Sequence, residues 1–136
     1  MNVKNISIGT ITYTAATFSL AVGWHVLLFE EMYLAFGYFE GEPNFALGFL
    51  TIVVQGVILS ILFPMVRLAG TSVFRGLKFA TIVGMFFWTS HVLAFVAKQP
   101  VPDVLQFVAM ETLYLAFQFG IFGVVIGLIY REERST

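Results

Sequence analysis

The sequence contains no cysteine and few charged residues. Without cysteine the chain can form neither disulfides nor thiolate metal sites, and it has no thiol nucleophile. Charged residues make up only 11% of the chain and sum to a net charge of −1, which excludes the basic surface of a nucleic-acid-binding protein. The sequence also lacks the motifs of serine hydrolases, zinc proteases and phosphate-binding loops, which favours a non-enzymatic role.

Apolar side chains, in contrast, are abundant. They account for 59% of the 136 residues, aromatic residues account for 17%, and the mean hydropathy is +0.91. Average globular proteins have about 45–50% apolar and about 25% charged residues. The composition therefore predicts an integral membrane protein, and the 16 phenylalanines argue against a disordered chain.

Four apolar stretches are long enough to cross a hydrocarbon core of about 30 Å, which requires about 20 helical residues. They cover approximately residues 7–29, 45–66, 79–97 and 106–130. We expect an all-α polytopic membrane protein, a four-transmembrane-helix bundle forming a single transmembrane domain over residues 1–136. The first stretch is too long for a signal peptide and is followed by Glu30 and Glu31 where a cleavage site should be, so we expect it to remain in the mature protein.

The cations are distributed unequally over the two sides of the predicted bundle. Lys98 stands alone on one side. The other side carries Lys4, Arg67, Arg75, Lys78, Arg131 and Arg134. By the positive-inside rule this bias predicts a multi-pass protein of the cytoplasmic (inner) membrane with both termini in the cytoplasm.

The two loops predicted on the outer side differ in character. The first, at about residues 31–43, mixes acids with aromatic rings: Glu30, Glu31, Glu40 and Glu42 with Tyr33, Phe36, Tyr38 and Phe39. We expect this segment to be an amphipathic hairpin or short helix in the membrane interface, with its rings at headgroup depth. In the second, Pro100 and Pro102 end the third helix and shape a tight return.

The two halves of the chain resemble each other weakly. His25 begins HVLLF and His91 begins HVLAF, 66 residues later, while Gln55 and Gln118 lie mid-span and 63 residues apart. Because each half would cross the membrane twice, a duplication would relate the halves by an axis along the membrane normal. The pattern fits a parallel 2+2 internal repeat, and it also fits chance similarity between apolar helices.

A few strongly polar side chains lie within the apolar stretches, where a charged group costs about 2.5–3.5 kcal/mol at the membrane centre. They are His25, Gln55, His91, Glu111 and Gln118. Counted inward from the outer helix ends, His25, His91 and Glu111 all lie roughly 8–9 Å below the outer boundary. We therefore predict one polar layer made of two imidazoles and a carboxyl, backed at mid-depth by the two glutamines.

Three uses of this layer remain open. The first is a pocket for a small or lipid-like ligand, such as a headgroup, quinone or other amphiphile. Its candidate ligand-binding residues are His25, His91, Glu111, Gln55, Gln118, Trp24, Trp88 and Glu31. The second is a haem b or divalent metal redox centre on His25, His91 and Glu111. The third is structural, with the polar seam holding the bundle together or docking it as an accessory subunit of a larger membrane complex.

The expected partners follow from the same features. Membrane lipids surround the bundle, and no nucleic acid is expected. Gly123 and Gly127 form a small-xxx-small pair, which occurs in homodimers and, more commonly, in contacts inside one bundle.

Several segments carry a resemblance to a known group of proteins. They are WHVLLF (24–29), GEPNF (41–45), QGVILSILFP (55–64), GLKFA (76–80), AKQPV (97–101) and QFGIFGVVIGLIY (118–130). With these segments the chain resembles the small bacterial four-helix integral membrane proteins near the DUF1761 grouping. The resemblance implies the fold and a bacterial inner membrane, and it implies no activity, cofactor or partner.

Overall fold

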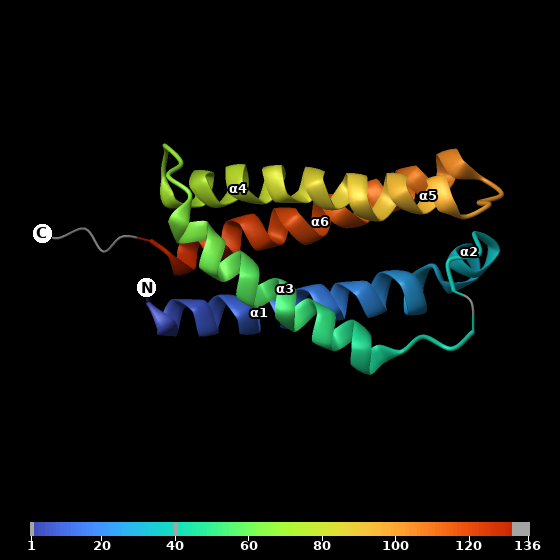
Figure 1. Cartoon of the computed structure of the whole chain (residues 1–136), viewed down its shortest axis with the longest axis horizontal. Coiled ribbons are helices and arrows are strands. Elements are labelled where there is room, and N and C mark those ends of the chain that lie inside the picture. The colour runs from blue at the N-terminus through green and yellow to red at the C-terminus, as the bar shows by residue number, and fades with distance from the viewer. Residues whose placement is uncertain (1, 40, 132–136) are drawn as a thin grey trace, which may run out of the picture.

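The computed structural model describes residues 2–39 and 41–131, and within them every regular element is a helix (Figure 1). Glu40 and Arg134, which entered the sequence argument, lie outside the described residues. Four helices are long and apolar enough to span a membrane: Val3–Leu28, Phe45–Met65, Ser72–Lys98 and Val104–Ile129. The prediction of an all-α, multi-pass membrane protein built as a four-helix bundle is confirmed.

Two of the four spanning helices contain a π-helical segment. The elements are α1 (Val3–Val22), η1 (Gly23–Leu28), α2 (Glu30–Ala35), α3 (Phe45–Met65), α4 (Ser72–Phe87), η2 (Trp88–Leu93), α5 (Ala94–Lys98) and α6 (Val104–Ile129). The first spanning helix therefore consists of α1 and η1, and the third consists of α4, η2 and α5. The start of α1 and the end of α6 lie at one end of the bundle, and α2 and the α5–α6 connection lie at the other (Figure 1).

The helices begin where polar side chains cap them. Asn44 accepts a hydrogen bond from the Leu47 amide at 2.9 Å, and Asp103 accepts one from the Gln106 amide at 2.9 Å. The third spanning helix begins at Ser72 rather than at 79, because its first turns include cations that the hydropathy pattern placed outside the membrane. Lys78 reaches out of the helix to the Ala69 carbonyl at 3.0 Å, so its charge does not end the helix.

Glycines bring α4 and α6 into close contact. A Cβ atom on Gly76 would overlap the backbone carbonyl of Gly123, and one on Gly127 would come within 2.9 Å of the Val73 Cα atom. Gly123 and Gly127, the small-xxx-small pair of α6, thus face α4 within the bundle. Of the two uses expected for this pair, the structure shows the contact inside one bundle. The homodimer stays a prediction.

Helix α3 packs closely along only part of its length. Figure 1 shows it crossing α1 obliquely. Near the middle of α3, a Cβ atom on Gly56 would lie 3.2 Å from the Thr10 carbonyl oxygen of α1. Towards its C-terminal end, Phe63 packs edge-on against Phe79 of α4, with ring centroids 5.3 Å apart. Its first turns, in contrast, carry exposed apolar side chains, including Phe45, Leu47 and Leu50.

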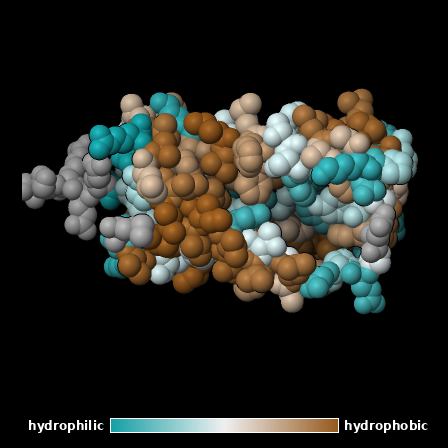
Figure 2. Space-filling view, in the orientation of Figure 1, coloured by the Kyte–Doolittle hydropathy of each residue, from teal (hydrophilic) through white to brown (hydrophobic). Residues whose placement is uncertain are grey.

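The outer surface is largely apolar. Figure 2 shows hydrophobic residues over much of the middle of the bundle and hydrophilic residues gathered toward its two ends. Many large apolar side chains of the spanning helices are exposed, among them Ile11, Leu62, Ile82, Met85, Phe86 and Leu128. In a membrane these side chains contact lipid, and every helix satisfies its own backbone hydrogen bonds.

We expect Gly76→Ala to destabilise the bundle by about 1–3 kcal/mol, because the new methyl group would meet rigid backbone rather than a movable side chain. Gly120→Ala is the matched control: no atom lies within 4 Å of its Cβ position, so helix propensity should leave stability unchanged or raised by up to about 1 kcal/mol. Thermal unfolding in detergent, followed by circular dichroism, checks both. Equal midpoints for the two variants would contradict the close α4–α6 contact.

Candidate functional site

The three intramembrane ionisable side chains meet. Nε2 of His25 lies 2.9 Å from Oε1 of Glu111, and Nε2 of His91 lies 2.9 Å from Oε2 of the same carboxyl group. Glu111 has no exposed surface, whereas the His91 side chain is 39% exposed. The predicted meeting of two imidazoles and a carboxyl from three different spanning helices is confirmed, and their common depth in the membrane stays a prediction.

Both histidines lie in the π-helical segments. His25 belongs to η1, whose sequence is GWHVLL, and His91 belongs to η2, whose sequence is WTSHVL. A π-helical turn inserts an extra residue into the helix, which changes the direction of the side chains that follow, and such turns occur frequently at functional sites. The HVLLF and HVLAF segments therefore share a π-helical distortion as well as similar residues. The hydropathy of the sequence does not reveal this distortion.

A tyrosine that the sequence analysis placed elsewhere completes the environment of Glu111. The Tyr33 hydroxyl donates to Oε1 of Glu111 at 2.6 Å and accepts a hydrogen bond from the Trp24 indole at 2.8 Å. Tyr33 and Phe36 are 0% and 3% exposed, so their rings pack inside the protein, while the depth of this segment in the membrane stays a prediction. Helix α2 lies at the end of the bundle opposite the start of α1 and the end of α6, and it packs these rings into the core (Figure 1). The three-residue spacing of Tyr33 and Phe36 on one helical face was the signal for this burial.

The hydrogen bonds of His25 restrict where protons reside. Nδ1 lies 3.0 Å from the Ala21 carbonyl, which can only accept, so Nδ1 carries a hydrogen. A neutral His25 then has a bare Nε2 that accepts the proton of Glu111, whereas a charged His25 donates from Nε2 to the carboxylate. The contact between His25 and Glu111 holds one proton in either form.

Two tyrosines outside the spanning helices remain protonated beside this contact. Burial and the nearby Glu111 charge raise the pKa of Tyr33 above its ordinary value. The same two causes raise the pKa of Tyr38. Both hydroxyl groups are therefore hydrogen-bond donors throughout the physiological pH range.

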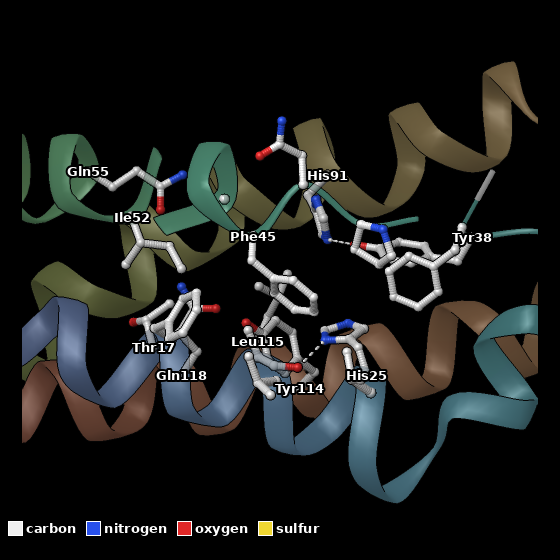
Figure 3. Close-up of a pocket in the computed structure, with 18 of the residues that line it drawn as sticks. Thr17, His25, Tyr38, Phe45, Ile52, Gln55, His91, Tyr114, Leu115 and Gln118 are labelled. Atoms are coloured by element: carbon white, nitrogen blue, oxygen red, sulfur yellow. Dashed lines mark hydrogen bonds between the residues drawn. The ribbon is translucent and has the colours of Figure 1, made fainter. Parts of the chain in front are cut away.

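A cavity of about 300 Å³ lies against this cluster. In Figure 3, His25 and His91 lie on opposite sides of it, with Tyr38 and Phe45 nearby. Its walls come from α1, η1, the segment that joins α2 to α3, the first half of α3, the end of α4, η2 and α6. The polar lining side chains are Thr17, His25, Tyr38, Asn44, Gln55, His91, Tyr114 and Gln118, and the rest of the lining is apolar or glycine.

The predicted mid-depth glutamines line the inner end of the same cavity. They are joined through Tyr13, which sequence reasoning missed: Gln118 Nε2 donates to the Tyr13 hydroxyl at 3.0 Å, and that hydroxyl donates to Gln55 Oε1 at 3.1 Å. Tyr13 follows Thr10 and precedes Thr17 on the polar stripe of α1, so helical spacing could have included it.

Several polar groups of the lining make no hydrogen bond among the described residues. They are the Tyr114 hydroxyl, the amide nitrogen of Gln55 and the carbonyl oxygen of Gln118. The Tyr38 hydroxyl lies 3.3 Å from Nε2 of His91, which already contacts Glu111. The side of the cluster that faces the protein core is satisfied, and the cavity side carries the unused groups.

Four candidate ligand-binding residues are absent from the described lining of the cavity, although one of them, Glu111, contacts the lining residues His25 and His91. Trp24 is buried and donates to Tyr33, behind the histidine layer. The Trp88 indole donates to Thr112 at 2.8 Å, which joins η2 to α6. Glu31 is exposed in the first turn of α2. The structure thus brings five of the eight candidates together: His25, His91, Glu111, Gln55 and Gln118.

Metal or haem binding would require this arrangement to change. Among residues 2–39 and 41–131, no group of three or more His, Cys, Asp or Glu side chains is arranged to hold a metal ion. Both Nε2 atoms contact the Glu111 carboxyl group, and they would have to leave it to act as axial ligands of a haem iron. The redox-centre alternative stays a prediction.

The chain matches no protein-family model, no curated protein and no solved structure. The resemblance to the DUF1761-like group therefore stays a prediction, and the function has to be inferred from the site itself.

We expect Tyr33→Phe to lower the free energy of unfolding by about 1–3 kcal/mol, because it leaves the Trp24 indole and Glu111 each without one hydrogen-bond partner. Tyr114→Phe is the matched control, since it removes a hydroxyl without a partner among the described residues from an equally buried ring. Unfolding midpoints of both variants in the same detergent test this. A loss of similar size in both would show that the Tyr33 hydrogen bonds add nothing specific.

Proposed function

We propose that this chain is a membrane protein that binds a small, lipid-like amphiphile in the cavity between α1, α3 and α6, without enzymatic turnover. The observation that carries the proposal is the cavity of about 300 Å³ beside a buried His–Glu–His cluster. This volume lies at the lower end of the range for small-molecule sites, about 300–1,000 Å³. A mostly apolar lining with a few convergent polar groups is also typical of such sites.

A purely structural role for the cluster is the main alternative. Hydrogen bonds between helices would account for His25, His91 and Glu111, each contributing about 0.6–2 kcal/mol. That role does not call for a cavity on one side of the cluster, nor for unused donors on Tyr114 and Gln55 that face it. A bound amphiphile would satisfy those donors and cover the apolar walls, which is why we favour binding.

The membrane and the orientation are part of the proposal. Arg67, Arg75 and Lys78 lie around the α3–α4 connection, at the same end as the start of α1 and the end of α6 (Figure 1). Lys98 ends α5 at the opposite end. We infer from the positive-inside rule that the termini face the cytoplasm of a bacterial cell and that the cavity lies in the outer half of the inner membrane.

We expect Gly48→Leu to abolish ligand retention. Gly48 lines the cavity, and no atom lies within 4 Å of its Cβ position, so a leucine there fills the cavity without disturbing helix contacts. Gly120→Leu is the matched control, because Gly120 also has open space but is not among the lining residues. Mass spectrometry of the lipids and small molecules that co-purify with each protein measures retention.

Two outcomes of this experiment are informative. A species retained at about one per chain by the wild type and by Gly120→Leu, but lost from Gly48→Leu, would support binding in the cavity. Equal retention by both variants would refute binding in the cavity. A folded wild type that retains no species at about one per chain would also refute it.

The absence of cysteine makes the orientation directly measurable. In intact cells, Gln99→Cys should react with a membrane-impermeant maleimide, whereas Ala69→Cys should react only after the cells are broken. Both positions are exposed and lie at opposite ends of the bundle. The reverse labelling pattern would place the cavity in the cytoplasmic half of the membrane.

A further inference from the structure

We propose that the occupant of the cavity is a neutral ring with a hydrogen-bond acceptor at each end, namely a 1,4-quinone. This inference rests on the proposed function and specifies its ligand. It follows from the donors at the two ends of the cavity and from the charge and composition of the walls.

Tyr38 provides the donor at the outer end. Its hydroxyl lies 3.3 Å from Nε2 of His91, and Nε2 lies closer, at 2.9 Å, to Oε2 of Glu111. When Nε2 donates to the carboxylate it has no lone pair left to accept, so the Tyr38 hydroxyl can only accept from it. The hydroxyl proton of Tyr38 is then free to donate to a ligand in the cavity.

Gln55 provides the donor at the inner end. The chain of hydrogen bonds runs from Nε2 of Gln118 through the Tyr13 hydroxyl to Oε1 of Gln55. The amide nitrogen of Gln55 is left with two hydrogens and no acceptor among the described residues. Since Gln55 lines the cavity, an acceptor on a ligand can satisfy it.

The two donors lie at opposite ends of the cavity. Figure 3 shows Tyr38 at one end and Gln55 at the other, with further lining side chains between them. A ligand that satisfies both donors therefore needs a hydrogen-bond acceptor at each of its ends. The carbonyl oxygens at opposite positions of a 1,4-quinone ring meet this requirement.

The walls favour a flat, uncharged ligand over an anionic lipid headgroup. Aromatic rings contribute to several walls, including Phe45 of α3, Phe87 of α4 and Tyr114 of α6. Neither lysine nor arginine occurs among the described lining residues, and the Glu111 carboxyl group lies directly behind the histidines. A phosphate or carboxylate in the cavity would find no lysine or arginine and would lie near the Glu111 carboxyl group, whereas a quinone carbonyl requires only a donor.

Decylubiquinone is the probe for a direct test. Trp24 packs against Tyr114 of the cavity wall, with ring centroids 6.2 Å apart. Decylubiquinone titrated into the purified protein in detergent should therefore quench the Trp24 fluorescence, and the quenching should saturate. Tyr38→Phe and Gln55→Leu should each weaken binding about three- to tenfold, the effect of one lost hydrogen bond. Tyr130→Phe is the control, because its hydroxyl donates to the Ser60 carbonyl far from the cavity, and it should bind like the wild type.

The outcomes separate this inference from the proposal on which it rests. Saturable binding that weakens in both variants, with unfolding midpoints close to that of the wild type, supports a quinone held at both ends. Binding unaffected by either substitution overturns the two-ended geometry. Failure of decylubiquinone to bind, while a different co-purified amphiphile is lost in Gly48→Leu, overturns the quinone and leaves the amphiphile site in place. Failure of both experiments removes the site altogether.

Discussion

The end of the bundle that carries α2 depends on the satisfaction of one carboxyl group. Glu111 has no exposed surface and would be costly in hydrocarbon without partners. Its two oxygens take up contacts from His25 of η1, Tyr33 of α2 and His91 of η2. Removing any one partner would leave a buried polar group unpaired, so the positions of the first and third spanning helices relative to α6 are set together.

The π-helical segments are the structural means by which this arrangement is reached. Each histidine follows a regular helix whose inner face packs tightly, α1 against α3 and α4 against α6. A continuous α-helix would extend that face without change, whereas one inserted residue turns the following side chains by a fraction of a turn. That both histidine helices are distorted at this depth is consistent with a parallel internal repeat. It is equally consistent with two helices that meet the same geometric demand at Glu111.

Hydropathy and depth predicted much of this structure, and the errors share one cause. The four spanning helices and the meeting of His25, His91 and Glu111 followed from stretch length and from counting residues inward, because membrane thickness fixes both. The buried position of Tyr33 did not follow from the sequence. A short segment of acidic and aromatic residues has the same sequence pattern whether its rings lie in the membrane interface or pack into the protein core. The π-helices and the Tyr13 bridge were also missed, because both depend on contacts between distant helices, which a single sequence does not contain.

Helix α3 explains why a cavity exists beside so well-satisfied a cluster. It is the spanning helix that gives no side chain to Glu111, and its close contacts lie in its middle and C-terminal half, at Gly56 with α1 and at Phe63 with α4. Its polar contact with α1, from Gln55 to Tyr13, also lies near its middle, whereas its first turns carry exposed apolar side chains and pack on α1 through the Phe49 and Phe18 rings. The cluster thus holds the remaining helices firmly while the start of α3 forms a wall that no polar contact closes. The start of α3 is therefore the wall whose displacement breaks none of the hydrogen bonds to Glu111.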